Sequence, residues 1–377
     1  MTKFNAKNER LKHEYLGYLR DAKGQDASSV DAAAKALARF EEVTKLKDFG
    51  RFHFEQAVAF KRQLQAQKNH RGTGLLSKST LHATLGHVKT FFTWLAGQPG
   101  YRSKLTHSDI AYFTLSGKDT RVATARREGV GPTLEQVKHV LGLMPTGTDL
   151  EKRDRALMAF TLMTGARDSA TVSFKLRHVD LAAGSVFQDA RDVKTKFSKS
   201  FTTVFLPVGL EVKQIVADWV NYLRMELLWG DDDPLFPATL VQVGATRRYE
   251  VVGLQRAHWK SAAAVRKTFR EAFFRAGLPY FYPHSFRNTL VRLGMSVCKG
   301  DPELLKAWSQ NIGHDKVMTT LMSYGAVSFD RQSEIIRGLG VAKADAPLAS
   351  ADVIKLLNEL VAQKNKPGLT GGDREAV

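Results

Sequence analysis

The sequence predicts a mainly α-helical protein of two domains, with one small antiparallel β-sheet in the second domain. Three observations support this prediction. Apolar residues recur with helical spacing through most of the chain, the spacing changes to an alternation of two within residues 178–207, and a basic stretch at 116–131 separates two apolar regions. The chain has 377 residues, of which 43% are hydrophobic, so it has enough material for two cores.

The first domain, residues 1–115, is predicted to be a bundle of amphipathic helices. Its first helix places Leu11, Tyr15 and Leu19 four residues apart, on one face. A second helix over residues 28–43 is rich in alanine, the residue with the highest helix propensity. We therefore expect this domain to fold around the apolar faces of its helices.

The most regular helix of the first domain is predicted over residues 77–97, with Ser79 as its N-cap and Gly97 at its end. Its apolar stripe consists of Leu81, Leu85, Val88, Phe92 and Leu95. The opposite face carries Lys78, His82 and Lys89. A solvated polar face accounts for any one of these residues, whereas the basic excess of the whole domain favours a surface that faces DNA.

Residues 116–131 are predicted to link the two domains. They have little apolar periodicity, glycine near both ends and a charged middle, a composition typical of linkers. The basic residues of this stretch are Lys118, Arg121, Arg126 and Arg127.

The second domain, residues 132–345, opens with two predicted helices. Thr133 and Gln136 form a capping box at the start of the first, and the strongly apolar second helix, residues 152–165, ends at a glycine. Residues 178–207 then offer three short runs rich in Val, Phe and Thr with an Ala-Gly turn between the first two, which predicts a small antiparallel sheet. Further helices are predicted over residues 210–228 and 261–277.

The charge of the chain indicates the class of partner. Lys and Arg number 56 against 38 Asp and Glu, which gives a formal net charge of +18. An anionic membrane surface, an acidic protein or a nucleic acid would each suit so basic a chain. Membrane-binding proteins usually concentrate their basic residues beside an apolar helix face at one end. Here the basic residues are spread along the whole chain, which favours a long polyanion.

Cysteine content and hydropathy indicate the compartment. Cys298 is the only cysteine, so neither an internal disulfide nor a multi-cysteine zinc site is expected, and a reducing cytoplasmic environment is predicted. The longest apolar run of note, residues 156–163, is far shorter than a membrane span. The first residues contain no apolar segment typical of a signal peptide.

Two basic side chains stand one helical turn apart in "FYPHSFRNTL", residues 281–290. Pro283 suits the first position of a helix, so His284 and Arg287 lie on one face of its first turn, beside the N–H groups of the helix N-terminus. On a strongly basic chain, the anion expected at such a site is phosphate. Chance placement of a surface histidine and arginine explains the pair equally well, because His-x-x-Arg alone is a weak motif.

Other reactive side chains are predicted at the boundaries of helices and strands, where they are able to converge. Arg167 follows the glycine that ends a helix in "TGARDSATVSF", and His314 follows another in "NIGHDKVMTTLMSYG". Asp315 is predicted to cap the next helix, and Tyr324 lies near the end of that helix. Three lysines lie in the predicted sheet between these motifs: Lys194, Lys196 and Lys199.

This order of residues resembles the tyrosine recombinase (phage integrase) family. "TGAR" is similar to the first arginine box, "PHSFRNTL" to the His-x-x-Arg box and "IGHDKVMTTLMSYGAV" to the closing Gly-His to Tyr box. The resemblance covers residues 130–340 by motif and the N-terminal region by architecture only. It implies a helical core-binding domain followed by a catalytic domain. The step from His314 to Tyr324 is one residue longer than the common family pattern, and no other tyrosine follows His314.

The resemblance implies a role for each of these residues. Tyr324 attacks a DNA phosphodiester and forms a 3′-phosphotyrosyl link, while Arg167 and Arg287 hold the non-bridging oxygens with the planar fork that suits phosphate. His284 and His314 supply hydrogen bonds and proton transfer, and a lysine protonates the leaving 5′-oxygen. Lys194 is chosen because it opens a Lys-Thr pair at the end of a strand, with Lys196 and Lys199 as alternatives.

By the same resemblance the chain is a site-specific recombinase that integrates or excises a mobile element. Its partners are double-stranded DNA and other copies of itself, in a tetramer on two DNA sites, with accessory DNA-bending proteins as further partners. Because the covalent link conserves the bond energy, neither ATP nor a metal is expected, and the chain has no GxxxxGK[ST] or HExxH motif. A type IB topoisomerase and a catalytically silent DNA-binding protein are the alternatives.

The tail, residues 346–377, is predicted to contain one more amphipathic helix. Ser350 is its N-cap, and Pro367 with Gly368 ends it. Its apolar stripe consists of Val353, Leu356, Leu357, Leu360 and Val361. A helix of this length must dock its stripe to be stable, either on its own catalytic domain or on a neighbouring protomer.

Overall fold

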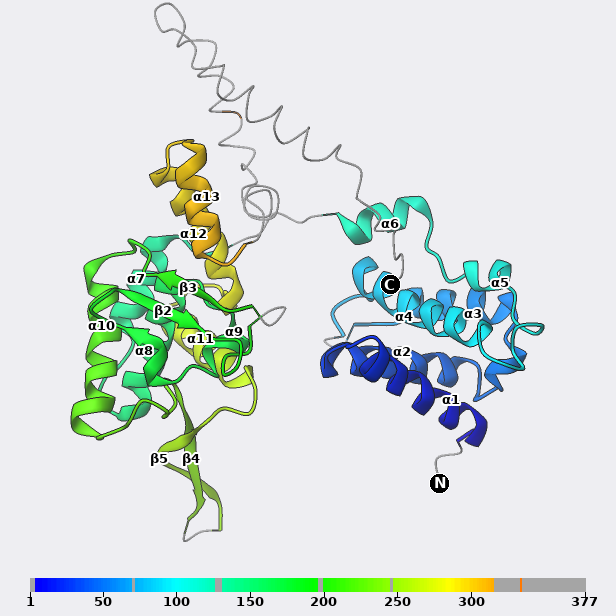
Figure 1. Cartoon of the computed structure of the whole chain (residues 1–377), viewed down its shortest axis with the longest axis horizontal. Coiled ribbons are helices and arrows are strands. Elements are labelled where there is room, and N and C mark those ends of the chain that lie inside the picture. Colours follow the sequence, from blue (N-terminus) through cyan, green and yellow to red (C-terminus); the bar gives the residue numbers. More distant parts are fainter. Residues whose placement is uncertain are drawn as a thin grey trace, which may run out of the picture. The chain divides into compact units, whose positions relative to one another are not determined.

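Residues 4–69, 72–125, 131–195, 199–244, 247–314 and Ser333 are described by the computed structural model. The contacts divide the chain into two units, Met1–Arg127 and Glu128–Val377, and each has its own hydrophobic core (Figure 1). In the described ranges no helix is long and apolar enough to cross a membrane. Tyr324, Lys196, Asp315 and the predicted tail helix lie outside the described residues.

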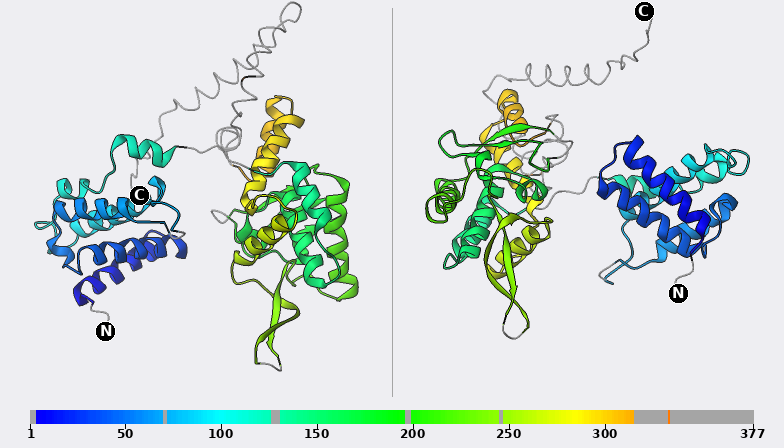
Figure 2. Two further views of the ribbon diagram at one scale, coloured as in Figure 1. Left: turned by 180° about the vertical axis from the view of Figure 1, so that it is seen from behind. Right: turned by 60° about the horizontal axis from the view of Figure 1, so that its bottom comes forward.

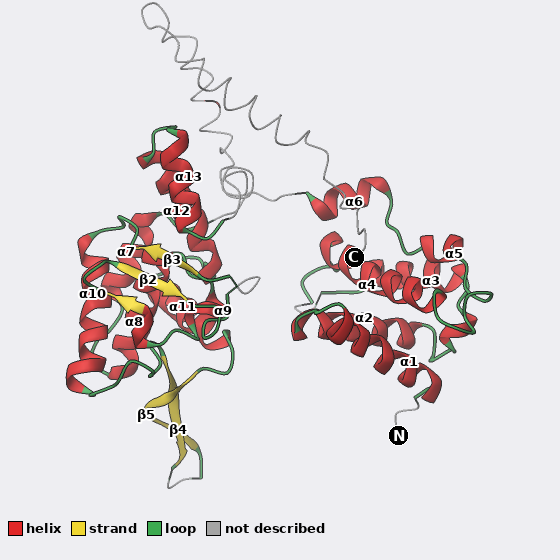
Figure 3. Cartoon of the chain, in the orientation of Figure 1, coloured by secondary structure: helices red, strands yellow, loops and turns green. Residues whose placement is uncertain are grey.

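The described part of the first unit consists of helices and turns, as Figure 3 shows by colour. Its helices are α1 (Ala6–Gly17), α2 (Ala27–Val43), α3 (Phe54–Ala66), α4 (Lys78–Ala96), α5 (His107–Ala111) and α6 (Gly117–Thr124). Fully buried phenylalanines form its centre: Phe40, Phe49, Phe60, Phe91, Phe92 and Phe113. The predicted stripe of α4 is buried, which confirms the helical periodicity.

Two details of this unit differ from the sequence prediction. Ser77, not Ser79, caps α4 by accepting a hydrogen bond from the Thr80 N–H at 3.1 Å. The Ser79 hydroxyl instead donates to the carbonyl of Ala123 in α6 at 2.9 Å. Helix α6 itself falls in the stretch that was predicted to be a linker. It buries none of its side chains, so it has no apolar stripe by which the sequence could reveal it.

The second unit is built around helix α8. The helices of the described part are α7 (Leu134–Leu143), α8 (Asp149–Thr164), α9 (Asp168–Thr171), α10 (Leu210–Asn221), α11 (Ala263–Arg275), α12 (Phe286–Val297) and α13 (Pro302–Asn311). Every residue of α8 after Arg155 is buried, because other elements of the unit pack around it (Figure 2). The predicted capping box of α7 is confirmed: Thr133 Oγ1 accepts from the Gln136 N–H at 3.1 Å, and Gln136 Oε1 accepts from the Thr133 N–H at 2.9 Å.

The predicted antiparallel sheet is confirmed. It has the order β1-β2-β3, formed by Val179–Asp180, Ser185–Gln188 and Phe201–Val204. Val179 pairs with Val186, and Val186 pairs with Thr203. Gly184 makes the turn between β1 and β2 with a φ of +63°, a conformation that glycine adopts at little cost.

A second sheet was not predicted. Strands β4 (Pro237–Val243) and β5 (Tyr249–His258) form a two-stranded ribbon that extends away from the helices of this unit (Figures 1 and 2). The buried Arg153 of α8 anchors its base, because Arg153 Nη1 donates to the Pro237 carbonyl and to Thr239 Oγ1, each at 3.1 Å. The outer half of the ribbon is exposed on both faces, so it lacks the alternation typical of a half-buried strand.

The first described residues of the second unit are clamped to α12. Arg292 Nη2 donates to the carbonyls of Gly131 and Pro132 at 2.7 and 2.9 Å, and the Thr289 hydroxyl also donates to the Pro132 carbonyl. A Cβ atom on Gly131 would lie 2.5 Å from the Ser285 carbonyl oxygen, which is too close for any side chain. The chain therefore enters this unit against the helix that carries Arg287.

Candidate active site

The Arg287 side chain joins the three motif segments that the sequence separates widely. Only 2% of this residue is exposed. Its Nη1 donates to the Gly165 carbonyl at 2.7 Å, and its Nη2 donates to the Ile312 carbonyl at 2.6 Å. The same Nη2 lies 2.7 Å from His314 Nε2. The flat, multiply donating guanidinium is the only side-chain group able to make these bonds together.

Gly165 provides the acceptor on the TGAR segment. It ends α8 with a φ of +62°, and its N–H donates to the Thr161 carbonyl at 2.9 Å, as in a helix that ends with a left-handed residue. A Cβ atom here would lie 3.0 Å from Leu290 Cδ1 and 3.8 Å from Arg287 Nη1. Glycine is therefore required both by the backbone conformation and by the close approach of α12.

His314 is held in place by the end of α13. Gly313 has a φ of +72°, its N–H donates to the Gln310 carbonyl at 2.8 Å, and the His314 N–H donates to the Ser309 carbonyl at 3.0 Å. These two bonds form a Schellman motif, in which the residue after the glycine turns back over the last helical turn. The motif directs the nearly buried His314 towards Arg287.

The contact with Arg287 defines the protonation of the His314 ring. A guanidinium donates hydrogen bonds and has no acceptor, so His314 Nε2 must accept. An imidazole with an unprotonated Nε2 carries its hydrogen on Nδ1. His314 is thus a neutral ring whose remaining polar function is to donate from Nδ1.

Arg167 and His284 occupy the predicted boundaries. Arg167 is the residue before α9, where its carbonyl accepts from the N–H and the hydroxyl of Thr171 at 2.9 and 3.0 Å. Its side chain is half-buried, and among the described residues none bonds to its guanidinium. His284 is half-buried in the 3-10 turn Pro283–Ser285, directly before α12. Pro283 is the first residue of that turn, as predicted.

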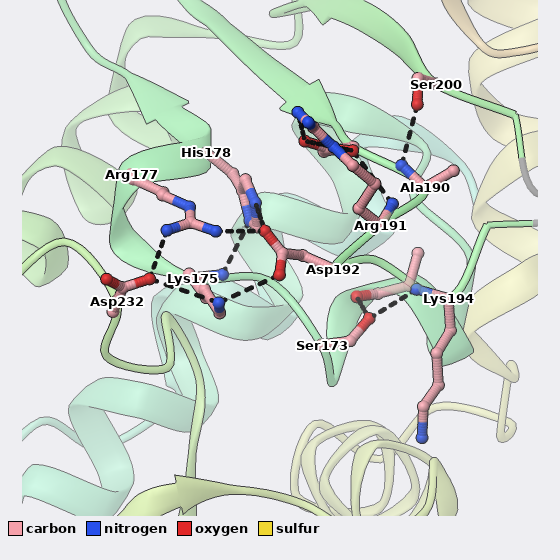
Figure 4. A network of polar contacts seen from close by, with 12 residues as sticks. Ser173, Lys175, Arg177, His178, Ala190, Arg191, Asp192, Lys194, Ser200 and Asp232 are labelled. Carbon is pink, nitrogen blue, oxygen red and sulfur yellow. Dashed lines mark hydrogen bonds and ion pairs between the residues drawn. The ribbon is translucent and has the colours of Figure 1, made fainter.

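Lys194 lies in the connection between β2 and β3, with its side chain exposed. Its backbone is bonded on both sides to the segment that follows Arg167. The Lys194 N–H donates to Ser173 Oγ at 2.9 Å (Figure 4). The Ser169 hydroxyl donates to the Lys194 carbonyl at 3.4 Å. Lys199, one of the alternatives, is exposed near the start of β3.

Asp192, two positions before Lys194, belongs to a group of charged residues that we call the Asp192 cluster: Lys175, Arg177, His178, Asp192 and Asp232 (Figure 4). Asp192 accepts from Lys175 Nζ at 3.0 Å, from Arg177 and from His178 Nε2 at 3.4 Å. Asp232 accepts from Arg177 and from Lys175 at 3.3 Å. The hydrogen bonds from Arg177 and Lys175 hold the pKa of Asp192 well below its usual range.

His178 has a defined tautomer in this cluster. Its Nδ1 accepts from the Lys175 N–H at 2.9 Å, so the ring hydrogen is on Nε2 and points to Asp192. Burial lowers the pKa of His178, and this effect exceeds the opposing attraction of Asp192. The acidic loop at residues 231–233 supplies one carboxylate of the cluster, that of Asp232.

The structure brings together Arg287, His314 and the Gly165 carbonyl two residues before Arg167, and it ties Lys194 to the segment that follows Arg167. Ser169, Ser173 and Asp192 were not predicted to be part of the site. The two serines are four residues apart directly after Arg167, a spacing that places them on one side of a helical segment. This spacing is the one signal in the sequence that could have indicated them.

The chain is similar to known proteins over most of its length. Residues 133–331 match the phage integrase family. A tyrosine recombinase XerC of Lactobacillus delbrueckii subsp. bulgaricus is 24% identical over 313 residues, which cover 82% of this chain and 92% of the relative. The XerC of Escherichia coli O157:H7 (strain EC4115 / EHEC) is 26% identical over 264 residues, which cover 70% of this chain and 74% of the relative.

Solved structures share the fold at low sequence identity. A lambda integrase(75-356) dimer bound to a COC' core site has a TM-score of 0.57 at 12% identity, covering 84% of this chain and 94% of the other. The Tn1549 transposon integrase in complex with transposon right end DNA has a TM-score of 0.52 at 14% identity, covering 88% of this chain and 99% of the other. With the family match over residues 133–331, the chain belongs to the phage integrase family, whose members are tyrosine recombinases.

Proposed function

We propose that this tyrosine recombinase cleaves and rejoins DNA through a 3′-phosphotyrosyl intermediate. The Tyr324 oxygen attacks the phosphorus of one phosphodiester, the P–O5′ bond breaks, and the electron pair of that bond leaves with the 5′-oxygen. The phenol proton passes to His284, and Lys194 gives a proton to the departing oxygen. Rejoining is the reverse of this step, so each strand exchange conserves the number of phosphodiester bonds and needs no ATP.

The observation that carries this proposal is the Arg287 guanidinium, which holds together the Gly165 carbonyl, the Ile312 carbonyl and the His314 ring. A phenol has a pKa of about 10 and is a weak nucleophile at neutral pH, so its attack needs cationic groups that are already in place. Arg167, which is half-buried and unbonded within the described ranges, is the second cation and grips the non-bridging oxygens.

The two histidines have different roles in this mechanism. Because His314 Nε2 accepts from Arg287, that nitrogen does not take the phenol proton. We assign His314 the role of a donor from Nδ1 to the phosphate, and His284 the role of the base. This division follows from the tautomer of His314.

The first unit is proposed to be the core-binding domain, residues 1–115, that grips the DNA duplex with the catalytic domain, residues 132–345. The net charge of +18 supports a partner with many phosphates. A structural neighbour, the lambda integrase tetramer bound to a Holliday junction, has a TM-score of 0.57. On this basis we propose a tetramer on two DNA sites that integrates or excises a mobile element. In this assembly the helix of the tail, residues 346–377, docks on its own or on a neighbouring protomer. Accessory DNA-bending proteins are proposed as further partners.

The decisive experiment traps the covalent intermediate. The full chain is incubated with a library of random-sequence duplexes that carry a nick, and DNA that stays attached to protein in SDS is sequenced to give the cleavage site. On that site, Tyr324→Phe should bind DNA normally and form no adduct, and EDTA should leave the wild-type reaction unchanged. Normal adducts with Tyr324→Phe would refute the assignment. Relaxation of a two-site plasmid without recombinant products would instead indicate a topoisomerase.

A further inference from the structure

The backbone of Lys194 is fixed from two directions, although its side chain is exposed. The N–H on one side donates to Ser173 Oγ at 2.9 Å, and the carbonyl on the other side accepts from the Ser169 hydroxyl at 3.4 Å. Lys194 lies in a long connection between β2 and β3, where no strand pairing restrains it. Hydrogen bonds from two serine side chains therefore hold the backbone of Lys194, directly after the buried Val193.

The Ser173 hydroxyl is well suited to hold a neighbouring chain. It is buried, and it donates to the Ala170 carbonyl at 2.9 Å and to the Ser169 carbonyl at 3.3 Å. Its hydrogen is engaged in these bonds, so its oxygen is oriented to accept from the Lys194 N–H. Loss of this hydroxyl would leave the Lys194 N–H without its acceptor in a partly buried position.

Both serines are tied to Arg167 by the same short segment. Arg167 precedes α9, and its carbonyl accepts from Thr171 in the first turn. Ser169 lies inside α9, and Ser173 follows its end. The bonds to Lys194 thus start from a rigid turn that also carries Arg167, so that the two side chains are positioned by one piece of backbone.

The Asp192 cluster makes a second attachment between the same two segments. Lys175, Arg177 and His178 follow Ser173 in the chain, and all three bond to Asp192, two residues before Lys194. Figure 4 shows the Lys194 side chain extending away from this cluster. The cluster therefore holds the backbone that leads to Lys194, and Ser173 holds the backbone of Lys194 itself.

We propose that Ser173 is a positioning residue, which places Lys194 relative to Arg167 so that the ammonium can protonate the leaving 5′-oxygen. The inference rests on the proposed function and deepens it. Ser169 contributes to the same effect through a longer bond. Proton delivery by a well-placed acid accelerates such a step by about 10²–10⁴-fold, and misplacement by about 1 Å can cost on the order of 10²-fold.

The test compares two substrates of the trapped sequence, one with the normal 5′-bridging oxygen and one with a 5′-bridging sulfur, which leaves without a proton. Ser173→Ala should cleave the oxygen substrate about 10–100-fold more slowly than the wild type and cleave the sulfur substrate within about twofold of it. Because the ratio of the two rates is measured on the same preparation, the fraction of folded protein cancels from it.

Ser200→Ala is the matched control. Ser200 Oγ also accepts from a backbone N–H of the same connection at 2.9 Å, but from Ala190, four residues before Lys194 (Figure 4). Its ratio should equal that of the wild type. If Ser173→Ala does not yield soluble protein, Ser169→Ala carries the same test with a smaller expected change. An unchanged ratio in the soluble variants, or equal slowing on both substrates, would overturn the inference.

Lys194→Ala separates this inference from the proposed function. Rescue of Lys194→Ala by the sulfur substrate supports the lysine assignment by itself. If the sulfur substrate rescues Lys196→Ala or Lys199→Ala but not Lys194→Ala, the lysine assignment is wrong. If it rescues Lys194→Ala while Ser173→Ala keeps the wild-type ratio of the two cleavage rates, only the positioning role of Ser173 is refuted. Absence of any covalent adduct with the wild type would refute the proposed function itself.

Discussion

Arg287 Nη2 lies 2.7 Å from His314 Nε2, between two side chains that are almost fully buried. The pair joins the first turn of α12 to the residue three positions after the end of α13. Since the guanidinium only donates, the contact determines the chemistry of the ring as well as its position. A histidine that was predicted only as a hydrogen-bonding or proton-transferring group is thereby assigned one tautomer.

The tautomer of His314 is directly measurable. We expect long-range ¹H–¹⁵N NMR spectra at neutral pH to show His314 protonated on Nδ1 and unprotonated on Nε2, because Nε2 accepts from Arg287. His314→Ala removes the signal and so assigns it. Protonation on Nε2 would mean that the guanidinium does not donate to this ring in solution.

The two arginines should respond differently to substitution. Arg287→Lys replaces the planar guanidinium with an ammonium group, which cannot donate to the Gly165 carbonyl, the Ile312 carbonyl and His314 together. Both the rate of cleavage and the thermal stability should therefore fall. Arg167→Lys should lower cleavage by about 10²–10³-fold with little change in the unfolding temperature, because no described residue bonds to its guanidinium.

Adduct formation and thermal unfolding, measured on both variants, distinguish these roles. Equal destabilisation by Arg287→Lys and Arg167→Lys would show that Arg167 also supports the fold. Cleavage within a few-fold of wild type for either variant would remove that arginine from the proposed mechanism.

Gly165→Ala should destabilise the second unit. An alanine at a φ of +62° costs about 1–2 kcal/mol, and its Cβ would press on Leu290 Cδ1 at 3.0 Å. For a unit of this size, each kcal/mol corresponds to a fall of about 2–4 °C in the unfolding temperature. Cleavage should fall as well, because the Gly165 carbonyl holds Arg287.

Gly142→Ala provides the control for that substitution. Gly142 is an exposed residue of α7 with open space around its Cβ position. The change should be neutral or stabilise by up to about 1 kcal/mol, since alanine is the better helix former. An equal loss of stability in Gly142→Ala and Gly165→Ala would contradict the conformational explanation.

The stability of the second unit should depend on the protonation of His178. Burial lowers the pKa of His178 in the folded state, so folding favours the neutral ring. The associated stability is therefore fully present above the unfolded pKa of about 6.5 and is lost as the pH falls through the lower folded value. Protonation of Nδ1 would also break its hydrogen bond with the Lys175 N–H.

Unfolding temperatures between pH 7.5 and 5.5 test this prediction. His178→Asn retains an acceptor near the Nδ1 position and does not titrate, so its unfolding temperature should fall less across the range than that of the wild type. His139→Asn, a change at an exposed residue of α7, should keep the wild-type dependence. A wild-type dependence in His178→Asn would assign the effect to another group.

DNA binding should be steeply salt-dependent if both units grip the duplex. The logarithm of the affinity is expected to fall with the logarithm of the salt concentration by about 0.9 for each phosphate contacted. Filter binding or fluorescence anisotropy over a range of salt concentrations measures this slope. A slope that corresponds to only one or two phosphates would contradict a clamp around DNA.

The sequence predicted those features that depend on neighbours in the chain. The capping box at Thr133, the glycine that ends α8 and the three-stranded sheet are local patterns of capping and periodicity. Helix α6 escaped prediction because it buries nothing, and the ribbon of β4 and β5 because its outer half is exposed on both faces. These elements are held by contacts with residues distant in the sequence, which periodicity does not reveal.

The features of the site divide in the same way, into residues that a local motif reveals and an arrangement that it does not. Arg167, His284, Arg287 and His314 stand in short motifs, so the sequence was sufficient to nominate them. Their mutual arrangement depends on backbone carbonyls and serine hydroxyls that have no distinctive pattern, such as the Ile312 carbonyl and Ser173 Oγ. The choice of Ser79 over Ser77 as the cap of α4 was wrong for a similar reason, since the Ala123 carbonyl that engages Ser79 is distant in the sequence.

The clamp on Gly131 and Pro132 has a mechanical consequence. Tension that enters the second unit along the backbone from its first described residues is borne by Thr289 and Arg292, on the helix that begins beside Arg287. A pull that enters from this side therefore loads α12 before it loads any of the described strands. In a force-extension measurement with handles at both ends of the chain, rupture of this clamp should precede unfolding of the helices around α8, and cleavage should be sensitive to load at forces too small to unfold the core.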